Sequence, residues 1–217
     1  LNYGCVPSKA LIKTATLARQ IRHSQDYGIA AATASIDFAQ VMERVAGVVR
    51  AVEPHDSIER YTALGVDVVT GHARLVNPWT VEIRRDDGST QTLTTRSIVI
   101  ATGAAPFVPP LPGLGDAGYL TSDTLGGLRD LPQRLVVLGG GPIGCELAQS
   151  FARLGSNVTQ IEMLPRIMIR EDEEVSAYAQ RVLEGDGVTI LCGHKALRCE
   201  QTADGKFIVV EAAGMEK

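Results

Sequence analysis

The sequence predicts an α/β fold, and two features of the chain carry that prediction. In the second half, an apolar strand at 134–138 runs through a glycine-rich turn into a helix at 143–154, and another strand follows at 157–162. This order is typical of a βαβ unit, in which a helix joins two parallel strands. In the first half, helical patterns within residues 10–64 give way to strand-like segments within residues 66–101. The chain has 217 residues, 45% of them hydrophobic, which is enough to bury one large core or two modest ones.

Helical segments are predicted in the early part of the chain. Residues 10–22 contain few helix breakers. Asp37 can cap a second helix that begins at Phe38, where valines recur on one side. Pro54 bends or restarts this helix, and Gly65 ends the last helical segment, since glycine tolerates the left-handed conformation of a helix C-terminus.

Strand-like segments follow. Residues 66–69 are short and β-branched, and residues 79–83 and 90–93 flank a charged turn with Asp-Gly, which favours a hairpin. A continuous apolar strand is expected at 97–101. The proline-rich stretch 106–113 cannot lie inside a sheet or a helix, so we place a domain boundary there.

The remainder of the second half continues the α/β pattern. A helix is expected over 173–184 and a strand over 188–191. A hairpin is expected over 195–210, with its turn at Asp204-Gly205.

Composition and charge exclude several classes of protein. The chain carries 21 basic and 25 acidic residues, a net charge of −4, without a basic patch, so we expect no nucleic-acid partner. No run of apolar residues is long enough to predict a membrane segment. The 4 cysteines are spaced irregularly, unlike those of a disulfide scaffold or a zinc site. We expect a reducing, cytoplasmic location.

The glycine-rich turn carries the strongest functional signal. Its residues are Gly139, Gly140, Gly141, Pro142, Ile143 and Gly144. They match the pattern G-x-G-x-x-G between a strand and a helix, where the glycines allow a tight turn, close approach of a pyrophosphate and close packing of helix on strand. Glu162 ends the next strand and can accept hydrogen bonds from a ribose 2′-hydroxyl, whereas it would repel a 2′-phosphate. We therefore predict an NAD site that prefers NADH over NADPH; the alternative is a glycine turn in an unliganded domain.

A second signal lies at the start of the chain, where Cys5 follows Gly4 and precedes Pro7 and Lys9. Pro7 suits the first turn of a helix, where its missing N–H costs no hydrogen bond. The positive end of a helix dipole favours a reactive thiolate. Cys5 is therefore either a redox-active thiol at a helix entry or an ordinary buried cysteine.

Together these signals resemble the class I pyridine nucleotide–disulfide oxidoreductases, the flavin-dependent family of dihydrolipoyl dehydrogenase, glutathione reductase and mercuric reductase. The redox loop of that family has the pattern Cys-x4-Cys-x-Pro-Ser-Lys, which residues 1–9 match from the first spacer residue onward. The resemblance implies that Cys5 is the second cysteine of a disulfide pair and that the first lies immediately before Leu1. We therefore expect the chain to be a fragment that begins inside its redox motif.

The resemblance also implies a specific version of the α/β fold. Residues 1–113 would form part of an FAD-binding Rossmann-like domain with the redox loop. Residues 114–217 would form an inserted, truncated NAD(P)-binding Rossmann-like domain.

Contacts with the cofactors are carried over from the family residue by residue. The family signature A-T-G-x-x-P matches residues 101–106, so Thr102, Gly103 and Ala104 would contact FAD. Ala73 is a further expected contact with FAD, and Ala196 is an expected contact with NAD.

The family also pairs the lysine of the redox loop with a glutamate beside flavin N5. This resemblance implies an ion pair between Lys9 and Glu146, in which Lys9 would stabilise negative charge on reduced flavin. The alternative is that Glu146 is an exposed carboxylate favoured by the start of its helix.

The resemblance implies that hydride passes from NADH to FAD and that electrons then pass to a cysteine pair containing Cys5. The final acceptor is a small-molecule thiol or disulfide, as in dihydrolipoyl dehydrogenase, or Hg(II), as in mercuric reductase, and the motifs leave both open. A homodimer is expected from the family. The alternative function is an NAD(H)-binding module without turnover, which we expect of the fragment by itself.

Overall fold

The computed structural model describes residues 4–216 and confirms the predicted α/β class. The chain divides into two compact units, one made of Leu1–Ala51 and Pro106–Lys217 and the other of Val52–Ala105. We call them the large unit and the small unit. The sequence predicts a boundary at the end of 106–113 between an FAD-binding domain and an NAD(P)-binding domain. The two compact units do not test this boundary, because it is defined by which cofactor each domain would bind, so it stays a prediction.

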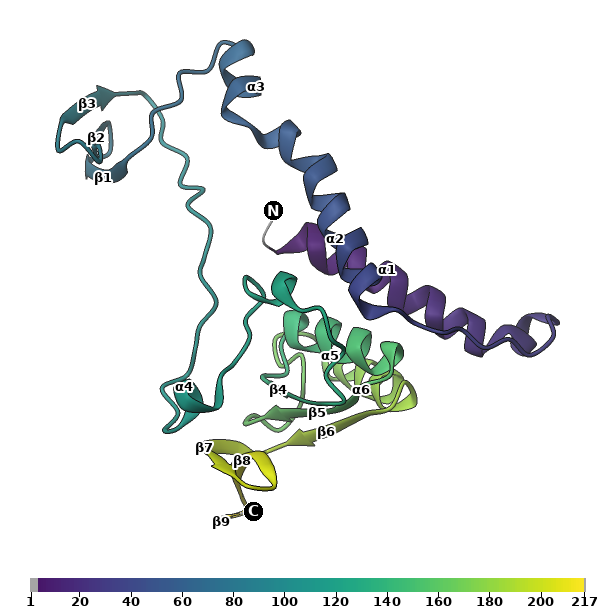
Figure 1. Ribbon diagram of the computed structural model, residues 1–217. Coiled ribbons are helices and arrows are strands. Elements are labelled where there is room, and N and C mark those ends of the chain that lie inside the picture. Colours follow the sequence, from purple (N-terminus) through teal and green to yellow (C-terminus); the bar gives the residue numbers. More distant parts are fainter. Residues whose placement is uncertain (1–3, 217) are drawn as a thin grey trace. The chain divides into compact units, whose positions relative to one another are not determined.

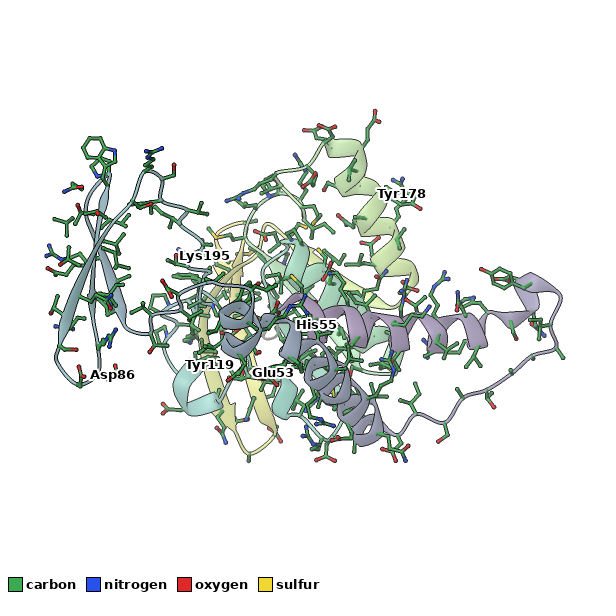
Figure 2. All side chains as sticks on the ribbon, turned by 90° about the horizontal axis from the view of Figure 1, so that it is seen from above. Glu53, His55, Asp86, Tyr119, Tyr178 and Lys195 are labelled. Atoms are coloured by element: carbon green, nitrogen blue, oxygen red, sulfur yellow. The ribbon has the colours of Figure 1, made fainter. Side chains whose placement is uncertain are left out.

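A parallel sheet lies at the centre of the large unit. Its strands are β4 (Arg134–Leu138), β5 (Asn157–Glu162) and β6 (Val188–Cys192), in that order. Helices α5 (Pro142–Leu154) and α6 (Glu173–Gly185) connect the strands and cover one side of this sheet (Figure 1). The outer face of α6 is open to solvent, where Tyr178 points away from the fold (Figure 2). The predicted βαβ unit is confirmed, with boundaries that differ by no more than a residue.

The two ends of α5 follow from its sequence. Pro142 occupies the first turn, where its missing N–H leaves no hydrogen bond unmade. Gly155 ends the helix with a φ of 116°, a left-handed conformation that glycine adopts without strain. Between these ends, the ring of Phe151 is buried and lies 5.9 Å from that of Phe38. This contact places α5 at the centre of the core of the large unit.

Helices α1 (Cys5–Arg22) and α2 (Phe38–Val52) share this core. The predicted helix start at Phe38 is confirmed, and the Asp37 carboxylate accepts a hydrogen bond from the N–H of Gln40 at 3.1 Å. The buried residues of α1 lie on one face of the helix and are mostly alanine: Ala10, Leu11, Ala15 and Ala18. Because these side chains are small, α1 packs closely on α5.

An antiparallel sheet completes the large unit. Its strands are β7 (Lys195–Thr202), β8 (Gly205–Ala212) and β9 (Met215–Glu216), in that order, and the predicted hairpin is confirmed. The short helix α4 (Leu114–Ala117) packs against this sheet. Gly113 precedes α4 with a φ of 76°, and a Cβ at this position would overlap the carbonyl oxygen of Cys199. Only glycine allows this approach of the two backbones.

The small unit contains a helical segment and an antiparallel sheet. A 3-10 turn (Glu53–Asp56) leads to α3 (Ile58–Ala63), where the Ser57 hydroxyl accepts a hydrogen bond from the N–H of Arg60 at 3.2 Å. The sheet strands are β1 (His72–Asn77), β2 (Thr80–Arg84) and β3 (Thr90–Thr94), in that order. The predicted hairpin is the β2–β3 pair, and Asp86 lies at its turn (Figure 2).

Two predicted strands are wrong. Residues 66–69 and 97–101 belong to none of the sheets formed within residues 4–216. A strand needs neighbouring strands to pair its N–H and C=O groups, and neither segment has such a neighbour among the described residues. Val99 and Ile100 are accordingly 88% and 69% exposed. Strand β1, in contrast, was not predicted, because its six residues are not apolar in alternation.

Candidate functional site

The glycine turn joins β4 to α5 in the way that the dinucleotide motif requires. Gly139 has a φ of 107°, and its N–H donates to the carbonyl oxygen of Ile161 on β5 at 2.8 Å. A Cβ at Gly144 would overlap the carbonyl oxygen of Gly139, so the first turn of α5 lies directly against the end of β4. No described side chain accepts a hydrogen bond at the start of α5, whose N-cap is Gly141. The N–H groups at the first turn of α5 are therefore available to an anion, and the dipole of the helix favours one.

Glu162 is tied to the glycine turn. Its Oε2 atom accepts a hydrogen bond from the N–H of Gly140 at 2.6 Å, and its Oε1 atom accepts one from the N–H of Leu164 at 2.7 Å. A carboxylate oxygen has two lone pairs, so each oxygen can accept a further hydrogen bond. Glu162 can therefore hold a hydroxyl group while it stays fixed against the turn.

A cleft of about 520 Å³ opens beside Glu162. It is lined by Gly140, Gly141, Pro142, Glu162, Met168, Ile169, Arg170 and Glu171. The loop before α6 closes one side, because the N–H of Met168 donates to the carbonyl oxygen of Gly140 at 2.7 Å. Met168 adopts a φ of 50°, which is uncommon for a residue with a side chain. This loop was not predicted to belong to the site, and its turn-forming residue, Pro165, does not indicate the left-handed conformation of Met168.

Lys9 and Glu146 lie together, as the resemblance implied. The Nζ atom of Lys9, on α1, is 2.6 Å and 2.7 Å from the two carboxylate oxygens of Glu146, on the first part of α5. Their side chains are 60% and 38% exposed, so the pair remains open to a ligand on its solvent side. The Glu146 carboxylate is therefore not a solitary surface group, and the pair joins α1 to the helix that carries the glycine turn.

Cys5 is the first residue of α1 and is exposed. This exposure favours the redox-active thiol over an ordinary buried cysteine, and the role of Cys5 stays a prediction. The cysteine expected immediately before Leu1 lies outside the chain, and the spacer residues before Gly4 lie outside the described residues. The other cysteines differ from Cys5: burial raises the pKa of the thiols of Cys145, Cys192 and Cys199. Their thiols are therefore predominantly protonated and poor nucleophiles.

The residues expected to contact FAD, apart from Lys9, all lie in the small unit. Thr102, Gly103 and Ala104 lie in the small unit, in exposed irregular chain where Gly103 has a φ of 69°. Ala73 lies on β1 opposite Ile83 and is also exposed. A contact of these four residues with FAD stays a prediction.

Ala196, the expected NAD contact, lies on β7 opposite Val210 and is half-buried. The chain turns from β6 to β7 close to the acid of the site, since the N–H of His194 donates to the carbonyl oxygen of Glu162 at 3.0 Å. A direct contact of Ala196 with the cofactor stays a prediction.

Gln160 supports the turn and was missed by sequence reasoning. It is fully buried on β5, and its Nε2 atom donates to the carbonyl oxygen of Gly139 at 2.9 Å. Its Oε1 atom is buried without a partner among the described residues. A sequence signal was present: Gln160 lies between Val158 and Ile161, the apolar residues of β5 that face the core. A polar side chain in such a place needs a hydrogen-bond partner, which indicates a structural role.

The part of the chain that the structure describes contains neither a membrane-spanning helix nor a cluster of metal-ligating side chains. Within residues 4–216, no helix combines the length and the apolar character needed to cross a membrane. The same residues contain no group of three or more His, Cys, Asp or Glu side chains that could hold a metal ion.

Comparison with known proteins connects these features to one family. The sequence profile of the family described as pyridine nucleotide-disulphide oxidoreductase matches residues 1–216. The chain is 31% identical over 217 residues to a mercuric reductase of Staphylococcus aureus. It is 34% identical over 198 residues to a dihydrolipoyl dehydrogenase of Chlorobaculum tepidum.

These alignments cover 100% and 90% of this chain but only 39% and 41% of the two relatives, so the chain spans about two fifths of their length. Among solved structures, the HOCl-induced flavoprotein disulfide reductase RclA from Escherichia coli matches with a TM-score of 0.73 at 27% identity. That match covers 100% of this chain and 45% of the other.

Proposed function

The chain belongs to the pyridine nucleotide-disulphide oxidoreductase family, and on this premise we propose that it supplies the redox thiol and the nicotinamide site of an FAD-dependent oxidoreductase. Members of the family bind FAD and NAD(P). When bound, the nicotinamide supplies a hydride and the flavin relays an electron pair to a disulfide. The observation that carries the proposal is the placement of Cys5 and the Lys9–Glu146 pair on α1 and α5, since α5 also begins with the glycine turn.

The glycine turn fits a dinucleotide on structural grounds. The approach of Gly144 to Gly139 leaves no room for a Cβ, and the start of α5 offers N–H groups with no side-chain acceptor among the described residues. The turn would hold the pyrophosphate through these groups. Glu162 would accept hydrogen bonds from the ribose, and its negative charge supports a preference for NADH over NADPH.

That preference is tested by the ratio of kcat/KM for NADH to kcat/KM for NADPH in the full-length protein. We expect a ratio well above one, and Glu162→Gln should lower it by about tenfold because the amide no longer repels a 2′-phosphate. Glu171→Gln removes a charge from another residue that lines the same cleft and serves as the matched control. An unchanged ratio in Glu162→Gln would mean that another residue selects the cofactor.

The residues of this chain divide the remaining tasks. The Lys9 ammonium, held by Glu146, would stabilise negative charge that develops on the reduced flavin, as a cation whose position is fixed. The Cys5 thiolate would lie next to the flavin and form a disulfide with the cysteine expected immediately before Leu1. A second sulfur is necessary because a dithiol–disulfide couple exchanges two electrons.

The acceptor is a small-molecule thiol or disulfide, or Hg(II), and both classes are represented among the relatives. Steady-state oxidation of NADH by the full-length protein, with lipoamide and with Hg(II) in excess thiol, separates them. Lipoamide reduction without mercury activity would identify a dihydrolipoyl dehydrogenase. Mercury-dependent turnover without lipoamide activity would identify a metal reductase, and activity with neither would reject both acceptors.

A second candidate function applies to the 217 residues taken alone. Because the chain spans about two fifths of its relatives, we propose that in isolation it binds NADH without turnover. A colourless purified chain that binds NADH would support this module, whereas flavin absorbance would show that it retains an FAD site. The homodimer and the cytoplasmic location also remain proposals, drawn from the family and from the reduced state expected of the cysteines.

A further inference from the structure

Asp186 is a buried acid that the proposed function does not use. It follows α6 as the C-cap residue, and its side chain is 3% exposed. Its Oδ1 atom accepts a hydrogen bond from Arg19 Nε at 2.7 Å. Its Oδ2 atom accepts from two groups of Arg153, at 2.7 Å and 2.9 Å, and from Gln149 Nε2 at 2.8 Å. The carboxylate therefore connects three helices, α1 through Arg19, α5 through Arg153 and Gln149, and its own α6.

The carboxylate is held in its charged form. Burial by itself raises the pKa of Asp186, but hydrogen bonds from Arg153 and Arg19 outweigh the effect of burial, so the pKa lies below its ordinary value. A buried charge with four donors around it is costly to displace, because moving one helix would leave the charge incompletely paired.

The apolar contact between α1 and α5 does not by itself fix how the helices are aligned. The residues of α1 buried in the shared core are mostly small, Ala10, Ala15 and Ala18 beside Leu11, and Ala148 of α5 is buried in the same core. Small, similar side chains permit close packing at more than one register, whereas a directional ion pair permits one. The register is therefore set by the polar contacts at the two ends of the interface.

Those polar contacts form two groups. Toward the start of α1, Lys9 pairs with Glu146. Toward its end, Arg19 pairs with Asp186, and Arg22 donates to the carbonyl oxygen of Arg153 at 2.6 Å. Since α1 is one continuous helix from Cys5 to Arg22, an anchor at Arg19 constrains the position of Cys5 about 20 Å away along the helix axis.

We propose that Asp186 is a positioning residue, which acts through Arg19 to fix α1, and with it Cys5 and Lys9, relative to the nicotinamide turn at the start of α5. The inference rests on the proposed function, because it assigns the contact a role in aligning the thiol and the lysine with the two cofactors. Neither Asp186 nor Arg19 touches a reacting atom. Their effect is on the geometry of hydride transfer, which falls steeply with small misplacements.

The test uses the full-length, FAD-loaded protein with Arg19→Gln. This variant removes the anchor on α1, yet Arg153 and Gln149 still pair the Asp186 carboxylate, so the buried charge is not orphaned. Rapid-mixing absorbance gives the rate constant of flavin reduction by NADH. We expect it to fall by about tenfold, while FAD content and the Kd of NADH stay within about twofold. The charge-transfer absorbance between Cys5 and flavin should weaken in parallel, and Arg19→Lys, which retains a cation that can donate to Asp186, should restore most of the rate.

Arg50→Gln is the matched control, because Arg50 and Glu43 form a 2.6 Å ion pair on α2 that does not involve α1 or α5. Flavin reduction at the wild-type rate in both Arg19→Gln and Asp186→Asn would overturn the inference. A loss of rate matched by an equal loss of NADH affinity or FAD content would also overturn it, because that pattern indicates a folding defect. If NADH does not reduce the flavin of the wild-type protein, the proposed function is wrong, and the inference about Asp186, which rests on it, is overturned as well.

Discussion

Helices α1 and α5 begin in the same way but are held in different ways. Both have a glycine N-cap, Gly4 for α1 and Gly141 for α5, at which no side chain among residues 4–216 accepts a capping hydrogen bond. Around the start of α5, contacts from Gln160, Glu162 and Met168 pair the backbone groups of the turn locally. At the start of α1, Cys5 is exposed, and the local side-chain contact is the Ser8 hydroxyl, which donates to its carbonyl oxygen at 3.1 Å.

The two helix starts are therefore held in position in two different ways. The turn at α5 is preorganised by its neighbours, as expected of a site that binds a fixed anion. The thiol at α1 is positioned from a distance, through Lys9 and Arg19. Changes near the turn should therefore alter nucleotide affinity, whereas changes along α1 should alter rates.

The largest expected effect comes from Cys5→Ser in the full-length protein. Reduction of a disulfide or of Hg(II) should fall by at least about 100-fold, since one sulfur of the pair is lost, while NADH should still reduce the flavin. Acceptor-dependent NADH oxidation measures this change. Cys192→Ala is the control and should retain activity; full activity in Cys5→Ser would show that another thiol carries the electrons.

Asp186→Asn tests how strongly the network holds α1. We expect the free energy of unfolding to fall by about 2 kcal/mol at neutral pH, because an amide cannot satisfy both arginines. The folded-state pKa of Asp186 is lowered, so its contribution is complete above the ordinary aspartate pKa and disappears as the pH falls through the folded-state pKa.

The deficit of Asp186→Asn should therefore shrink as the pH falls below about 4. Denaturant unfolding at several pH values measures this difference. Asp26→Asn, at an exposed aspartate, is the control. A deficit that is constant with pH would contradict an ionised Asp186 in the folded protein.

Gly144→Ala should act on the turn alone. A Cβ would overlap the Gly139 carbonyl oxygen, so the turn must open and the Kd of NADH should rise by about tenfold. Fluorescence titration with NADH measures the change. Gly185→Ala on α6 is matched to it, because a Cβ there meets nothing within 4 Å. Equal affinities in the two variants would mean that the turn does not bind the nucleotide.

The smallest effect is expected from Arg50→Gln. The pair that Arg50 makes with Glu43 is exposed on both sides, 63% and 62%, and such pairs contribute little because water screens them. We expect Tm and the rate of flavin reduction to match the wild-type protein. A clear fall in either would show that the position of α1 also depends on α2.

The sequence predicted those parts of the fold that depend on residues adjacent in the chain. The β4–α5–β5 unit follows from an apolar strand, a glycine turn and Gly155 as a helix terminator, all within adjacent sequence. The apolar segment 97–101 gave the same local signal, but a strand also requires a partner, which sequence periodicity does not supply.

The site residues likewise differ in whether they depend on a local motif or on contacts between distant parts of the sequence. Glu162 was predictable because its place after β5 is part of the dinucleotide motif. The contact between Lys9 and Glu146 joins residues far apart in the sequence and was implied only by family resemblance. Asp186 was not predictable, since its role depends on three helices that meet only after packing.

The most direct measurement is anaerobic reduction of the flavin in the full-length protein by NADH and by NADPH, followed by rapid-mixing absorbance. We predict bound FAD that NADH reduces faster than NADPH does, followed by a charge-transfer band from Cys5. A protein that binds FAD but is reduced by neither nucleotide would contradict the assignment of the glycine turn and the redox helix to one oxidoreductase.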